Sequence, residues 1–125
     1  MNLRRNNIQI KGAGHVIQAT GYSLAGFRVL MREEAARLEV VMLLVALVSF
    51  YIAGVAWLHY FILAAIFFVL LCVEAINTAI ELIVDRTSPE ISEYGKQTKD
   101  LGSFAVFCML AVFSIYSLLV VFAPT

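Results

Sequence analysis

The sequence predicts an all-α integral membrane protein, built from one amphipathic helix and three membrane-spanning helices in a single domain (residues 1–125). Of the 125 residues, 62% are hydrophobic and only 14% are charged, and the mean hydropathy is +0.88. Residues 40–73 and 101–125 contain no Asp, Glu, Lys or Arg. A soluble domain of this size needs more polar side chains to cover its surface, and disordered chains are poor in apolar residues.

The N-terminal segment, residues 1–21, is followed by a stretch that reads as an amphipathic helix over residues 22–39. Ser23 can serve as its N-cap, and apolar residues recur every three or four positions behind it. Such a helix beside a membrane span is expected to lie in the membrane interface. A soluble extension of the first span is the simpler alternative.

Three apolar stretches are long enough to cross the hydrocarbon layer, which needs about 17–25 residues. They are residues 40–57, 60–84 and 101–122. Trp57, His59 and Tyr60 form an interfacial cluster at a very short connection, so the first two spans are expected to form a helical hairpin. Residues 85–100 are polar and are expected to form a loop.

The distribution of charge predicts the orientation in the membrane. Basic residues lie before the first span, in residues 1–39, and in the 85–100 loop, whereas the turn between the first two spans and the C-terminus have none. The positive-inside rule therefore places the N-terminus and the loop in the cytoplasm and the C-terminus outside. The nine basic and nine acidic residues cancel, so nothing indicates a nucleic-acid partner.

The second span carries polar side chains that crossing a membrane does not require: Glu74, Asn77, Glu81 and Asp85. At 100° per residue the three carboxylates fall within about 20° of one line, and the amide lies about 60° away. Glu74 is about 16 Å deeper than Asp85. An acidic residue at that depth costs about 2.5–3.5 kcal/mol, which points to a function.

A structural role remains open for part of this stripe. Asn77 and Thr78 suit hydrogen bonds between helices, and Asp85 could simply lie at the membrane surface. Glutamates are poor for that purpose, because such bonds need no negative charge. Carboxylates near the cytosol can hold a divalent cation, and one in drier surroundings can accept a proton from a hydroxyl. We therefore expect Glu81 to bind a metal and Glu74 to act as a base.

Two neighbouring segments offer further site residues. Glu33 and Glu34 are adjacent, and only one of them can face the second span from a helix. Lys99 and Asp100 come just before the third span. Lys99 could meet a phosphate, balance the carboxylates, or simply contribute to the positive-inside pattern.

The segments EAINTAIELIVDR (74–86) and KDLGS (99–103) resemble the bacterial diacylglycerol kinase family of small integral membrane enzymes. The first matches the family pattern E-x-x-N-[ST]-A-I-E-x-x-V-D. Upstream, GYSLAGFR (21–28) and EEAA (33–36) are similar to the family's amphipathic N-terminal helix. The resemblance covers about residues 15–123.

The resemblance implies a bacterial inner-membrane kinase that transfers the γ-phosphate of MgATP to the hydroxyl of diacylglycerol, giving phosphatidic acid. It also implies a homotrimer whose sites are shared between protomers. Matched position by position, Glu74 is the general base, and Glu34 and Glu81 bind Mg²⁺ and ATP. The other implied positions are Asn77, Lys99 and Asp100 for catalysis, Tyr22, Glu90, Lys99 and Asp100 for the nucleotide, and His15, Arg28, Arg37 and Ser103 for the lipid.

This chain departs from the family pattern at four places. His15 stands where the enzymes typically have arginine, and Thr20 where alanine is usual. Residues 35–39 are one residue shorter than the pattern, and the loop around Ser92 lacks an aromatic–histidine pair seen in some members. These departures affect the expected nucleotide and lipid contacts and leave the carboxylate stripe unchanged.

Three alternative functions are open at this point. A kinase of the same family could act on a polyprenol such as undecaprenol. A small multidrug transporter also places a membrane glutamate in a short chain, but it needs four spans and an acidic residue in the first, where the predicted span 40–57 has none. A non-catalytic membrane subunit would leave the polar stripe without a purpose.

Overall fold

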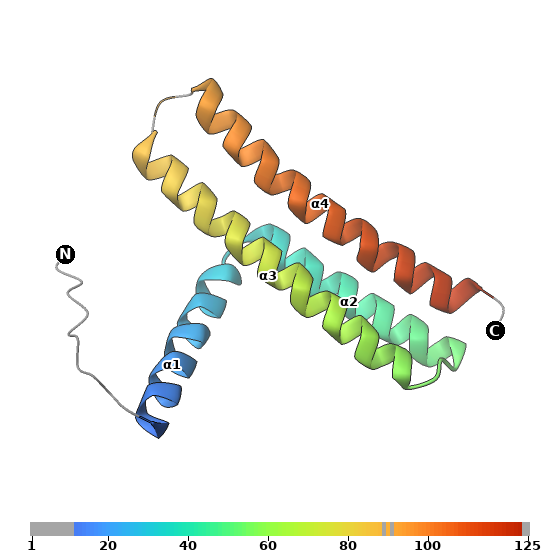
Figure 1. Cartoon of the computed structure of the whole chain (residues 1–125). Helices are drawn as coiled ribbons and strands as arrows, with labels where there is room; N and C mark the ends of the chain where they lie inside the picture. The colour runs from blue at the N-terminus through green and yellow to red at the C-terminus, as the bar shows by residue number, and fades with distance from the viewer. Residues whose placement is uncertain (1–11, 89, 91, 124–125) are drawn as a thin grey trace.

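The computed structural model describes residues 12–88, 90 and 92–123, which form four helices (Figure 1). They are α1 (Ala13–Leu30), α2 (Glu34–Ala53), α3 (Leu58–Thr87) and α4 (Glu93–Phe122). The last three are long and apolar enough to cross a membrane, which confirms the predicted all-α fold with three spans. α1 points away from the other three, and the junction between α1 and α2 lies near the middle of α3 (Figure 1).

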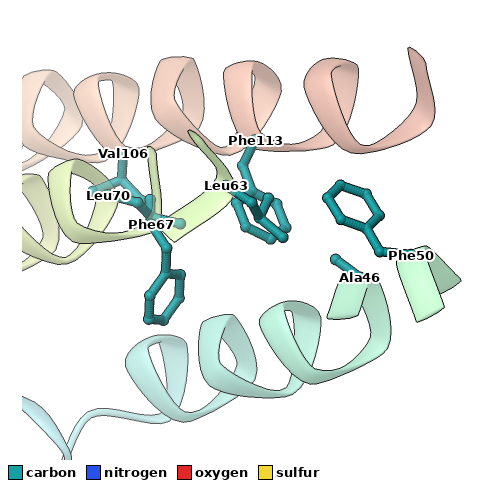
Figure 2. Packing of buried hydrophobic residues seen from close by; sticks show 7 residues of the cluster. All are labelled: Ala46, Phe50, Leu63, Phe67, Leu70, Val106 and Phe113. Atoms are coloured by element: carbon teal, nitrogen blue, oxygen red, sulfur yellow. The ribbon is translucent and has the colours of Figure 1, made fainter. Parts of the chain in front are cut away.

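The three long helices pack through faces that repeat every three or four residues. The buried side chains of α3 are Leu63, Phe67, Leu70, Glu74, Asn77, Thr78 and Val84. On α4 they are Gly95, Gly102, Val106 and Phe113. This spacing is that of helices crossing at a small angle, with the ridges of one in the grooves of the other. Figure 2 shows the apolar part of the core, where Phe67 and Leu63 of α3 lie beside residues of α2 and α4.

A tight turn joins α2 to α3. Gly54 ends α2 in the left-handed conformation (φ 66°, ψ 36°), and its N–H donates to the carbonyl of Tyr51. Glycine adopts this conformation without the steric penalty of a Cβ, which makes it a common helix terminator. The predicted hairpin is confirmed. Its turn lies slightly earlier than expected, because Trp57 precedes α3 and does not end α2.

The single helix expected over residues 22–39 is two helices in the structure. α1 begins at Ala13, and the chain bends at residues 31–33 before α2 starts at Glu34. Arg37 stabilises this bend, because its guanidinium donates to the carbonyl of Arg32 at 3.1 Å. Ser23 is not an N-cap, since it lies inside α1 and its hydroxyl donates to the carbonyl of Ala19. The first spanning helix, α2, therefore includes residues 34–39, which the sequence places in the interfacial helix.

The polar stretch expected as a loop over residues 85–100 is mostly helical. α3 runs to Thr87, and α4 starts at Glu93 after Ser92, whose hydroxyl accepts from the N–H of Gly95 at 3.0 Å. Each of these 30-residue helices is about 45 Å long. The hydrocarbon layer is only about 30 Å thick. The polar residues are therefore helical turns that extend beyond the apolar layer.

Candidate active site

A group of buried polar side chains lies where the end of α1 and the start of α2 meet α3. Glu39 of α2 is 3% exposed, and Glu74 and Asn77 of α3 are 4% and 6% exposed. Thr78 is buried beside them. All four continue the buried faces of their helices, so the packing that forms the apolar core also brings these polar groups inside. Glu74, predicted from the sequence as a site residue, thus lies in the interior of the chain.

Glu39 of α2 and Glu74 of α3 interact electrostatically. Within the described residues, neither oxygen of Glu39 has a hydrogen-bond donor, and the same holds for Oε2 of Glu74. Glu33 and Glu81 also interact electrostatically with Glu74. Glu74 is therefore surrounded by acidic groups at a buried position.

Asn77 links this buried group to Glu81. Its Nδ2 donates to Oε1 of Glu81 at 3.5 Å, and its Oδ1 points toward Gly102 of α4. A Cβ at position 102 would lie only 2.1 Å from that oxygen. Glycine at this position is thus what lets the amide fit between α3 and α4. Asn77 and Glu81, predicted to share a stripe with Glu74, do lie together.

Asp85 does not share that buried face. Val84 is the last buried side chain of α3 and lies against Gly95 of α4. Adjacent residues on a helix point about 100° apart, so Asp85 lies beside this contact and not in it. Asp85 is exposed, and its Oδ1 accepts from Nζ of Lys99 at 2.5 Å.

The end of the α3–α4 hairpin forms a charged hollow of about 270 Å³. Lys99 reaches across to α3 through Asp85 and also interacts electrostatically with Glu81. Lys96 pairs with Asp100 at 2.7 Å within α4. The lining residues are Val84, Asp85, Ser88, Glu90, Ser92, Gly95, Lys96, Lys99 and Asp100. The hollow therefore contains three predicted site residues, Glu90, Lys99 and Asp100, and a second cationic side chain, Lys96.

The predicted metal ligands, Glu34 and Glu81, lie on different helices, at the start of α2 and on α3. Glu34 is exposed, and its neighbour Glu33, which precedes α2, is the one that interacts with Glu74. In the part of the chain that the structure describes, no three His, Cys, Asp or Glu side chains are grouped to hold a metal ion. Carboxylate oxygens suit Mg²⁺ chemically, and a magnesium site at Glu34 and Glu81 stays a prediction.

The predicted lipid and nucleotide contacts outside α3 lie on exposed surfaces. His15, Tyr22 and Arg28 are on α1, and Arg37 is near the start of α2. Tyr22 accepts a hydrogen bond from Gln18, and Arg37 is engaged at the α1–α2 bend. Ser103 is exposed on α4 directly after Gly102. Their contacts with lipid and nucleotide therefore stay predictions.

Glu39 is the site residue that sequence reasoning missed. It belongs to the stretch expected as an interfacial helix over residues 22–39, but it lies on the buried face of α2. A usable signal was present, because Glu39 follows Ala36 by three residues and precedes Ala46 and Phe50 by seven and eleven. All of these are buried. A carboxylate on the same helical face as small and apolar residues indicates a buried acid.

Comparison with known proteins is consistent with this arrangement. The family model described as prokaryotic diacylglycerol kinase matches residues 21–122. A diacylglycerol kinase from Sinorhizobium is 46% identical over 110 residues, covering 88% of this chain and 80% of its own length. Those from Pseudomonas aeruginosa and Escherichia coli K12 are 39% and 36% identical, over 83% and 81% of this chain and 85% and 84% of their own. The chain belongs to the prokaryotic diacylglycerol kinase family.

Proposed function

We propose that this protein transfers the γ-phosphate of ATP to the hydroxyl of diacylglycerol and so produces phosphatidic acid. The observation that carries the proposal is the position of Glu74. This carboxylate is buried on α3 at membrane depth, and a few turns further along the same helix lies the charged hollow of the α3–α4 hairpin. A lipid hydroxyl and a water-soluble nucleotide can meet only at such a boundary between the membrane and the cytosol. The relatives' shared name of diacylglycerol kinase supports this substrate pair.

Glu74 acts as the general base in this proposal. The hydroxyl oxygen of the lipid forms a bond to the γ-phosphorus, and its proton passes to the carboxylate of Glu74. The bond between the γ-phosphorus and the bridging oxygen breaks, and ADP leaves with that electron pair. Little covalent help is needed in such a transfer, so positioning and charge neutralisation supply most of the rate. Asn77 helps to position Glu81 through its amide.

Lys99 offsets the negative charge of the phosphates, because it lies at the rim of the hollow and is only partly buried. Tyr22, Glu90 and Asp100 are proposed to contact the nucleotide. Glu34 and Glu81 would hold Mg²⁺, which when bound neutralises phosphate charge. Since Glu34 is exposed on its own chain, we propose that it comes from a neighbouring protomer.

The proposed assembly is a homotrimer in the bacterial inner membrane. Each of the three long helices leaves most of its surface exposed in a single chain. The polar side chains Glu81 and Lys99 are also only partly covered there. Polar membrane residues are expected to face protein or water and not lipid. Partner copies can supply that cover, and cyclic symmetry is a common solution. His15, Arg28, Arg37 and Ser103 are proposed to contact the lipid substrate, with the N-terminus and the α3–α4 hairpin in the cytoplasm.

One earlier reason to set aside a small multidrug transporter is wrong. The first spanning helix does contain a buried acid, because Glu39 lies inside α2. The transporter is now disfavoured because the chain belongs to a kinase family and because the described residues form three spanning helices where four would be required.

A phosphoryl-transfer assay tests the proposed function. The purified protein in detergent micelles receives MgATP with diacylglycerol, with a polyprenol, or with no lipid. Phosphatidic acid is the expected product, and the other two mixtures should stay near background. Preference for the polyprenol would reassign the acceptor within the family. Absence of transfer to either lipid by folded protein would overturn the proposal.

A further inference from the structure

The charged hollow at the end of the α3–α4 hairpin is acidic overall. Its described lining includes three carboxylates, on Asp85, Glu90 and Asp100, and two cations, on Lys96 and Lys99. With Lys99 as its one cation the hollow would carry two excess negative charges, and Lys96 reduces this excess to one. The phosphates of a nucleotide are anionic too, and like charges brought together disfavour binding. A second cation in this hollow is therefore what polyphosphate binding requires.

Both lysines are paired with carboxylates of the same hollow. Lys99 of α4 donates to Asp85 of α3, and Lys96 donates to Oδ2 of Asp100 at 2.7 Å. A phosphate oxygen accepts the same charge-assisted hydrogen bond from an ammonium group as a carboxylate oxygen does. The side chains of Lys96 and Asp100 are 70% and 62% exposed, so separating this pair costs little. A phosphate can thus replace Asp100 on Lys96.

Two hydroxyl groups in the wall of the hollow provide a neutral donor. The Oγ atoms of Ser88 and Ser92 are 3.0 Å apart, so one hydroxyl donates to the other. Oγ of Ser92 also accepts from the N–H of Gly95 at 3.0 Å. Each hydroxyl has one proton, and the bond between the two uses only one of them. The second proton is left for water or for an oxygen of a bound phosphate.

We propose that Lys96 is a nucleotide-binding residue, which contacts a phosphate that is not transferred. This inference rests on the proposed function. The γ-phosphorus must approach the lipid hydroxyl near Glu74, on the side of α4 where Gly102 contacts Asn77. Lys96 precedes Lys99 by three residues, so it lies about 4.5 Å further from that contact along α4. Lys99 therefore meets the γ-phosphate, and Lys96 meets the α- or β-phosphate.

The exchange of partners also gives Asp100 a role at an anion-binding site. Once Lys96 binds phosphate, the carboxylate of Asp100 is released from its ion pair. An ionised carboxylate only accepts hydrogen bonds, so it suits the ribose hydroxyls of a nucleotide and not the phosphates. ATP and ADP share the α- and β-phosphates, so removal of the Lys96 charge should weaken the binding of both nucleotides equally.

Equilibrium binding to the full-length protein in micelles tests this without turnover. Isothermal titration calorimetry measures Kd for a non-hydrolysable MgATP analogue and for MgADP. Lys96→Met should raise both Kd values by about tenfold, and Lys96→Arg, which keeps the charge, should stay within about threefold of the parent. Arg86→Met is the matched control, because it removes the same charge from an exposed position in the last turn of α3 that does not line the hollow. Its Kd values should equal those of the parent.

The same proteins are then compared in the transfer assay, where Lys96→Met should raise KM for ATP by the same factor as Kd. If Lys96→Met binds both nucleotides more weakly but the parent transfers no phosphate to diacylglycerol, the proposed function fails and the assignment of Lys96 stands. Equal Kd values for Lys96→Met and Arg86→Met overturn the inference, as does a parent that binds neither nucleotide. A loss confined to the ATP analogue also overturns it, because Lys96 would then contact the γ-phosphate.

Discussion

Gly102 offers the sharpest test of how α3 and α4 position the site. In the Gly102→Ala variant the new Cβ would lie 2.1 Å from Oδ1 and 3.1 Å from Cγ of Asn77. The first distance is about 1.4 Å short of an optimal contact. Asn77 is 6% exposed, so its amide has little free space to occupy. Either the amide rotates away and loses its bond to Glu81, or the two helices move apart.

The size of the effect follows from these two responses. Separation of the helices is overpacking, which lowers the free energy of unfolding by about 1–3 kcal/mol. Rotation of the amide costs less stability but misplaces Glu81, and a displacement of about 1 Å in a catalytic group can lower activity by about a hundredfold. We therefore expect Gly102→Ala to reduce kcat at least about tenfold, whichever response occurs.

The assay compares Gly102→Ala with Gly26→Ala, whose new Cβ meets no atom within 4 Å. Both changes raise helix propensity, which should stabilise each helix by about 1 kcal/mol. Kinase activity and denaturant unfolding in micelles are measured for both. A Gly102→Ala protein as active and as stable as Gly26→Ala would refute the packing argument. In an Asn77→Ala background the destabilisation should vanish, because the clashing atoms are gone.

Three further predictions follow from the proposed roles of the charged residues. Glu81→Gln should raise the Mg²⁺ concentration needed for half-maximal activity, as a metal titration would show, and an unchanged titration would remove Glu81 from the metal site. Lys99→Met should lower kcat by at least about tenfold, as the transfer assay would show. It should change the free energy of unfolding by less than about 1 kcal/mol, because the pair of Lys99 with Asp85 is at the surface, and unfolding curves would check this. Co-expression of the inactive variants Glu34→Gln and Glu74→Gln should restore about a quarter of the parent activity if sites are shared between protomers, whereas no recovery would place both residues on one chain.

Much of the fold could be predicted from the sequence because the membrane imposes strong rules on composition. The charge-free stretches 40–73 and 101–125 predict the three spans, and the structure has three helices over these regions. The α2–α3 hairpin is also clear in advance, since the interfacial cluster of Trp57, His59 and Tyr60 lies at a very short connection between two apolar stretches. These features depend on local composition, which the sequence displays directly.

The bend between α1 and α2 could not be predicted in the same way. Residues 31–33 include no glycine or proline, so nothing local marks the end of a helix. The bend depends on Arg37, which caps the carbonyls of the preceding turn, and on packing against α3. Without this bend, residues 34–39 belong to the expected interfacial helix, which gives no reason for Glu39 to be buried.

The residues of the candidate site could likewise be predicted only in part. Glu74, Asn77 and Glu81 could be found because charged and amide groups stand out in an apolar span. The exposed position of Asp85 could not, since it depends on which side chains in the last turns of α3 are covered by α4. The role of Gly102 also needed the structure, because only the distance to Asn77 shows that a side chain has no room there.

The central claim is that Glu74 accepts the proton of the lipid hydroxyl during phosphoryl transfer. The most direct measurement is the transfer of labelled γ-phosphate from ATP to diacylglycerol by Glu74→Gln, beside the parent and Glu93→Gln in the same micelles. The amide has nearly the shape of the carboxylate but cannot take up a proton, so Glu74→Gln should stay folded and form no labelled phosphatidic acid. The other two proteins should form it at equal rates. Near-parental turnover by Glu74→Gln would contradict the account.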